Sequence, residues 1–82
     1  MREKMLSYND YKKMIREKLV VYLARFIPRF GEIDVDAYME QESAFIRSEY
    51  DRDTKMYETG DLSYTVLLER PSTVAYCLDM MY

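Results

Sequence analysis

Histidine and tryptophan are absent from this chain of 82 residues, and cysteine occurs once, at Cys77. A single cysteine excludes an intramolecular disulfide, and an unpaired thiol is typical of proteins in a reducing compartment. Without histidine, the chain lacks the most common general base and the most common ligand for zinc, copper and nickel. We therefore expect no cofactor, no metal site and no nucleophilic centre of the Ser/His or Cys/His kind.

Glycine and proline are also scarce, with two of each. Gly31 and Gly60 stand alone, whereas phosphate-binding loops need several closely spaced glycines. Residues 51–55 resemble the start of a calcium loop, but Lys55 and Met56 stand where such a loop needs a ligand and a glycine. The 15 acids leave a carboxylate-pair hydrolase open in principle, although no spacing singles out a pair. We expect a protein that is not an enzyme.

Long hydrophobic runs are missing as well. The longest, residues 19–27, has nine residues and contains Arg25, whereas a membrane-spanning helix needs about 20 apolar residues. The first residues are not followed by the apolar segment of a signal peptide. We therefore expect a cytoplasmic protein without a membrane segment, with residues 1–82 forming one small domain.

The clearest local pattern lies near the N-terminus. Apolar side chains recur at three- and four-residue steps from Tyr8 to Phe26, which predicts an amphipathic helix over residues 7–27. Ser7 can cap its start, and Pro28 is predicted to end it. The last two turns are apolar nearly all round, which predicts that they are deeply buried.

A second long helix is predicted over about residues 35–57, because good helix formers and an apolar stripe coincide there. Its charged residues 51–53 mark a place where it can break, and Gly60 marks its end. Beyond Gly60, two short helices on either side of Pro71 are favoured. The alternative is a β-hairpin at about residues 64–78, suggested by β-branched side chains.

The predicted fold class is therefore all-α, a small bundle of two long helices with one or two short C-terminal helices. With the hairpin, it would be α+β. A domain of this size buries only about 60% of the surface of its unfolded chain, so help from self-association or from a partner is expected.

The net charge of −3 hides an asymmetry along the chain. Residues 1–29 carry eight Lys and Arg against three acids, whereas residues 30–82 carry four against twelve. The most acidic stretch, residues 32–61, holds ten acids against three Lys and Arg, with tyrosines interleaved. Carboxylates along a helix can imitate phosphates, and tyrosines add rigid contact area with a polar tip. A solvated helix face with its caps would explain about half of these acids.

We expect the binding face for a partner to combine acids and tyrosines of this stretch. Its predicted members are Tyr38, Glu42, Glu49, Tyr50, Asp51, Asp53, Tyr57 and Glu58.

The C-terminal segment is apolar on two sides. One helical stripe consists of Val74, Cys77, Leu78 and Met81. The stripe predicts that Cys77 is a small buried residue. Because one small core can cover only one side, we expect the other to lie against a neighbouring copy, in an oligomer interface, or against the partner itself. The predicted interface residues are Met80, Met81 and Tyr82.

Three functions follow from these features. A short, acidic, tyrosine-rich chain is typical of small inhibitors encoded by phages and mobile elements, which suggests a non-enzymatic inhibitor or regulator. It would bind a basic, nucleic-acid-handling protein through the acidic face, by nucleic-acid mimicry. The first alternative is a homo-oligomeric helical regulatory protein, for example a homodimer, assembled through the C-terminal segment. The second is direct nucleic-acid binding by Lys12, Lys13 and Arg16 on the first helix, which the sequence pI of about 4.9 disfavours.

Overall fold

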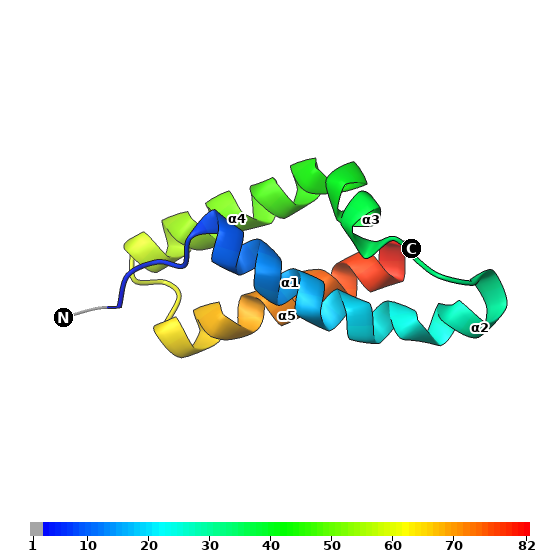
Figure 1. The fold of residues 1–82 in the computed structure, drawn as a ribbon. Coiled ribbons are helices and arrows are strands. Elements are labelled where there is room, and N and C mark those ends of the chain that lie inside the picture. The colour runs from blue at the N-terminus through cyan, green and yellow to red at the C-terminus, as the bar shows by residue number, and fades with distance from the viewer. Residues whose placement is uncertain (1–2) are drawn as a thin grey trace.

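The computed structural model describes residues 3–82 as helices joined by short connections (Figure 1). The elements are α1 (Tyr8–Leu23), the 3₁₀ turn η1 (Ala24–Phe26), α2 (Ile27–Phe30), α3 (Val35–Gln41), α4 (Ser43–Glu58) and α5 (Tyr64–Met81). The predicted all-α class is confirmed. Residues 64–78 contain no strand, so the hairpin alternative is wrong.

Helix α1 begins where its cap predicts. The hydroxyl oxygen of Ser7 accepts a hydrogen bond of 3.1 Å from the backbone N–H of Asp10. Such a cap satisfies one of the N–H groups that have no partner within the helix. From there every fourth side chain faces the core, and the fully buried positions are Tyr11, Ile15, Leu19 and Leu23.

The chain stays helical beyond Pro28, contrary to the prediction that this proline ends the helix. Pro28 lies in the first turn of α2, where its missing N–H has no helical partner to lose. Helical structure ends at Gly31 instead, whose φ of +79° is costly for any residue with a Cβ. The N–H of Gly31 closes this last turn by donating to the carbonyl of Ile27 at 2.8 Å.

The predicted second helix is two helices. The break falls at Glu42, between α3 and α4, and residues 51–53 are helical. The charges near these residues are paired, because Arg47 lies 3.2 Å from Asp51 and Arg52 lies 2.8 Å from Glu49. Ion pairs at such spacings support a helix instead of interrupting it.

Helix α5 is one continuous element, not two short helices. Ser63 caps it by accepting a hydrogen bond of 3.2 Å from the N–H of Val66. Pro71 lies inside the helix and is fully buried. A proline in a helix interior costs about 3 kcal/mol, and the packing of this side chain in the core offsets part of that cost. The helix presents Val74, Ala75 and Leu78 to the core.

The helices pack as an elongated bundle with extents of 47 × 21 × 19 Å. Helices α1 and α5 make the most extensive contact and run in the same direction, while α4 runs back beside them (Figure 1). The main core consists of Tyr11, Ile15, Leu19, Leu23, Met39, Ile46, Val74, Ala75 and Leu78. A smaller cluster of Tyr57, Leu62 and Leu67 lies at the turn between α4 and α5. Within residues 3–82, no helix combines the length and the hydropathy that crossing a bilayer requires.

Candidate protein-binding surfaces

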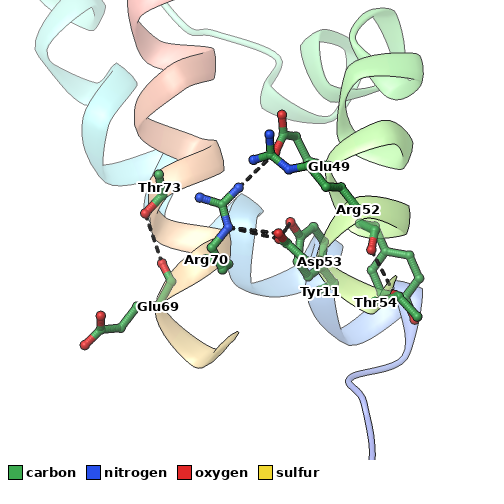
Figure 2. A network of polar contacts seen from close by, with 9 residues as sticks. Tyr11, Glu49, Arg52, Asp53, Thr54, Glu69, Arg70 and Thr73 are labelled. Atoms are coloured by element: carbon green, nitrogen blue, oxygen red, sulfur yellow. Dashed lines mark hydrogen bonds and ion pairs between the residues drawn. The ribbon is translucent and has the colours of Figure 1, made fainter. Parts of the chain in front are cut away.

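A buried ion cluster joins three helices. Asp53 of α4 is 1% exposed and accepts a hydrogen bond of 2.6 Å from the hydroxyl of Tyr11 in α1. Nε of Arg70 in α5 donates to both Asp53 carboxylate oxygens at 3.1 Å, and its Nη2 donates to Glu49 at 2.8 Å (Figure 2). Because each carboxylate oxygen of Asp53 has a donor, the cluster serves to hold the helices in register.

The electrostatics of this cluster agree with a structural role. Burial raises the pKa of the Tyr11 hydroxyl, and its hydrogen bond to the Asp53 carboxylate raises it further. Burial alone would lower the pKa of Arg70, but its bonds to Asp53 and Glu49 outweigh this effect and the pKa is raised. The tyrosine therefore stays protonated and the arginine stays charged. Among the described residues, no group of three acids or cysteines is placed to hold a metal ion.

The structure removes part of the acidic face predicted for a partner. Asp53 is buried beneath Arg70 and cannot contact a partner, which corrects its assignment to that face. Glu49 is half-buried and paired with both Arg70 and Arg52. Asp51 is exposed but paired with Arg47. The middle of α4, which the prediction assigned to the acidic face, thus carries acids that are paired with arginines of the chain.

The remaining predicted acids lie far from each other. Glu42 is half-buried at the turn between α3 and α4, and Glu58 is exposed at the opposite end of α4. A helix of 16 residues is about 24 Å long at about 1.5 Å per residue. These two acids therefore do not form a single contact surface.

The three tyrosines of the predicted face direct their hydroxyls inward. Tyr38 donates to the carbonyl of Leu78 at 2.7 Å, and Tyr50 donates to the carbonyl of Leu6 at 2.6 Å. Tyr57 is buried, with its hydroxyl bonded to the carbonyl of Glu3. Tyrosine tips usually find a partner when they are buried. The assignment of Tyr57 to the binding face is therefore wrong, because this residue belongs to the core. Tyr38 and Tyr50 are half-buried, and each connects two segments of the chain by its hydrogen bond.

The C-terminal residues predicted for an oligomer interface are exposed together. Met80 is 68% exposed, Met81 51% and Tyr82 48%. The ring of Tyr82 lies 5.3 Å from that of Phe26 and 5.0 Å from that of Tyr38, so aromatic contacts hold it between the C-terminal end of α1 and helix α3.

Burial of the last two turns of the first predicted helix holds for Leu23, which is 1% exposed, but not for Val21 and Ile27, which are 66% and 48% exposed. Phe30 of α2 is also 61% exposed, and α2 extends past the other helices (Figure 1). Tyr76 of α5 is also exposed, and its ring lies 6.4 Å from that of Tyr22 in α1. The ring of Phe26 lies 5.9 Å from that of Phe30 and 5.3 Å from that of Tyr82, so exposed aromatic side chains of α2 and α5 lie near each other. We use the name apolar end for the exposed apolar side chains at the C-terminal ends of α1, α2 and α5, which are Val21, Phe30, Tyr76, Met80, Met81 and Tyr82.

Two arginines border the apolar end. Arg25 lies over the ring of Phe26 at 4.4 Å, and its Nη1 is 2.7 Å from one carboxylate oxygen of the buried Asp79 and 2.8 Å from the other. Arg29 lies over the ring of Phe30 at 5.6 Å. Cations over aromatic faces are attracted to the ring and shield part of it from water. Cys77, predicted to be buried, is exposed beside this surface because Ala75 and Leu78 face the core in its place.

The basic side of α1 is partly neutralised. Nε of Arg16 lies 2.7 Å from a carboxylate oxygen of Asp36, and this hydrogen bond raises the pKa of Arg16 and lowers that of Asp36. The ammonium group of Lys12 lies 4.7 Å from the centre of the Tyr8 ring. Only Lys13 of the three predicted phosphate-binding residues is exposed with no such contact.

A groove runs beside the last turns of α1. It has a volume of about 620 Å³, and its wall is formed by α1 on one side and residues 32–36 on the other. Comparison of the chain with known protein families, curated proteins and solved structures finds no match. The apolar end and this groove are two surfaces with exposed apolar side chains among the residues that the structure describes.

Proposed function

We propose that the protein is a non-enzymatic helical regulator that self-associates through its apolar end. The observation that carries this proposal is the exposure of Val21, Phe30 and Met80, each more than 60%, at the C-terminal ends of α1, α2 and α5. The ring of Phe26 connects two of these ends, because it lies 5.9 Å from the ring of Phe30 and 5.3 Å from that of Tyr82. Exposed apolar surface of this kind marks an interaction site more often than it marks a free surface. The exposed thiol of Cys77 fits a reducing compartment, so we propose a cytoplasmic protein.

A second copy of the chain suits this surface because it carries both signs of charge. Glu69, Thr73, Tyr76 and Met80 form one exposed stripe along α5. Lys18 of α1 and Arg29 of α2 are exposed as well. In a twofold dimer the same surface of each protomer contacts its symmetry mate in the opposite orientation. Lys18 and Arg29 of one protomer can therefore face Glu69 of the other. Burial of each large apolar side chain is worth about 1.5–3 kcal/mol before the cost of association.

The test is the mass of the protein in solution at micromolar concentration, measured by light scattering and sedimentation. The wild-type chain should be a dimer, and Val21→Asp combined with Met80→Asp should shift it to monomer. Neither side chain belongs to the core, so the helical circular dichroism spectrum should not change. A matched control places Asp at Val66 and Leu68, which are exposed near the other end of α5, and should remain dimeric. A wild-type monomer would contradict the proposal.

A second function is favoured by the acids that have no counterion. Glu32, Asp34 and Glu40 are exposed around α3 and form no ion pair with another described residue, whereas acids in the middle of α4 are paired. Such a surface attracts a basic protein, and its carboxylates can occupy sites that normally receive phosphates. We therefore also propose inhibition of a basic nucleic-acid-handling protein, the first hypothesis from the sequence. In this proposal the binding surface is the region around α3 and not α4.

A further inference from the structure

The groove beside α1 has an apolar floor that no residue of the described range 3–82 covers completely. Val20 and Ile27 are 41% and 48% exposed, although both line the groove. Leu23 is fully buried beneath them, and Ile33 and Val35 form the opposite wall while remaining half-buried. Its volume of about 620 Å³ falls in the range of about 300–1,000 Å³ that is usual for ligand sites.

The rim of the groove is acidic. Glu32, Asp34 and Asp36 border it, together with Arg16. The ion pair of 2.7 Å between Arg16 and Asp36 neutralises one acid. Asp34 accepts a hydrogen bond of 3.0 Å from the N–H of Ala37 but has no cation, and Glu32 has neither. The occupant is therefore expected to bring apolar side chains for the floor and positive charge for the rim.

We infer that this groove binds a cationic amphipathic segment of the protein that the chain regulates. This inference rests on the proposed regulatory function. Side chains such as Leu or Ile would cover Val20 and Ile27, while Lys or Arg on the flanks would face Glu32 and Asp34. An amphipathic helix laid in a hydrophobic groove is a common mode of peptide recognition. A basic partner is also what the acidic region around α3 attracts over distance.

The chain's own cations are less suited to fill the groove of a second copy. Arg25 is held by Asp79 and lies over Phe26, and Arg29 lies over Phe30. Both belong to the border of the apolar end, which the proposed dimer covers. The groove is lined by Val20 and Ile27 and by no residue of the apolar end, so we expect it to stay open in that dimer.

The inference is tested with a defined probe, a synthetic peptide of about 14 residues with Leu at three- and four-residue steps and Lys at the other positions. Its affinity for the full chain is measured by fluorescence anisotropy, and its position by amide shifts of the ¹⁵N-labelled protein. The shifts should concentrate in residues 20–36. Ile27→Asp should weaken binding at least about tenfold, which corresponds to about 1.4 kcal/mol. Glu32→Lys should weaken it about fivefold at low salt and less at high salt.

Control variants distinguish peptide binding in the groove from nonspecific hydrophobic or electrostatic binding and from dimer formation. Asp61→Lys combined with Leu68→Asp changes a similar charge and apolar area elsewhere and should leave the affinity unchanged. A peptide with Glu in place of Lys should not bind. Shifts centred on the apolar end, or equal affinity for both peptides, would overturn the inference. Conversion of the wild-type dimer to monomer by Ile27→Asp would also overturn it, because a second copy would then fill the groove.

The two proposals can fail independently. Val21→Asp combined with Met80→Asp should change the mass of the protein without changing the affinity for the peptide. If this variant and the wild type are both monomers while the peptide binds at residues 20–36, self-association is refuted and the groove stands. If the mass changes as expected but no peptide binds, the groove is refuted and the dimer stands.

Discussion

The hydroxyl of Tyr11 donates a 2.6 Å hydrogen bond to Asp53, which lies 42 residues further along the chain. This bond fixes α1 against α4 at a carboxylate that is 1% exposed and also bound by Arg70. A hydrogen bond to a buried charge is worth more than one between neutral groups, because the charge has lost its water. The register of the bundle therefore depends on a small number of polar atoms.

Tyr11→Phe should destabilise the fold by about 1.5–3 kcal/mol, the usual value of a hydrogen bond to a charged group. The ring stays in the core, so the change isolates the hydroxyl. The measurement is the free energy of unfolding in urea at neutral pH. Tyr8→Phe serves as the control, because the half-buried Tyr8 ring makes no hydrogen bond through its hydroxyl. Equal stability of the two variants would contradict the prediction.

The same tyrosine predicts a loss of stability in alkaline solution. Burial first, and then the bond to Asp53, raise the pKa of Tyr11 above its ordinary value of 10.0. The unfolded chain releases this proton near pH 10 and the folded chain does not, so the contribution to stability is complete below about pH 10 and falls as pH rises above it. The slope of unfolding free energy against pH above 10 should be shallower in Tyr11→Phe than in the wild type. Parallel curves would show that Tyr11 does not carry the effect.

Asp53 and Arg70 should be strongly coupled. Arg70→Met leaves a buried carboxylate without its cation, and removal of one partner of a buried pair costs about 3–5 kcal/mol. Asp53→Asn leaves Arg70 with only Glu49. In the double variant neither charge is left unmatched, so its loss should be smaller than the sum of the single losses by about 0.5–3 kcal/mol. A double-mutant cycle of urea unfolding measures this coupling, and additive losses would contradict it.

Local signals in the sequence predicted the helical parts of this fold well. The cap at Ser7 and the periodic burial of Ile15 and Leu19 depend only on neighbours within a few turns, which is what periodicity reports. The errors occurred where tertiary contacts override local preference. Pro71 is tolerated because its ring is packed in the core, and Pro28 is tolerated because it lies in the first turn of α2.

The candidate surfaces were harder to predict than the helices. The acidic composition of residues 32–61 was visible, but the pairing of Asp53 with Arg70 depends on the register of α4 against α5, which no local pattern contains. An apolar run also does not show whether enough other helices are present to bury it. Residues 20–30 are apolar enough for a core, yet only Leu23 among them is fully buried, while Val20, Val21, Ile27 and Phe30 remain exposed. Helix α2 extends past the other helices (Figure 1).

The region around α3 should show a salt-dependent attraction for basic partners that α4 does not share. Glu32→Lys combined with Glu40→Lys should weaken binding of a polylysine probe several-fold at low salt, because neither acid forms an ion pair within residues 3–82. Arg47→Ala with Asp51→Ala removes a pair of opposite charges joined at 3.2 Å and should change the affinity little. Anisotropy titrations at two salt concentrations measure both variants. Equal effects of the two variants would contradict the prediction, because the attraction of the basic probe would then not be specific to the region around α3.

Cys77 provides a direct readout of the apolar end. It is the only cysteine of the chain, it is exposed, and it precedes Met80 by one helical turn. A maleimide should therefore react readily with the monomer. If the apolar end is covered by a second copy, the rate of alkylation should fall about fivefold as the protein concentration rises well above the dimer dissociation constant, because only the free fraction reacts. The rate in Val21→Asp combined with Met80→Asp should stay high at every concentration.

The thiol of Cys77 also lies outside the core, so labelling should not unfold the protein. The helical circular dichroism spectrum of the labelled chain checks this. A rate that is independent of concentration in a wild-type chain of dimeric mass would move the interface away from the end of α5.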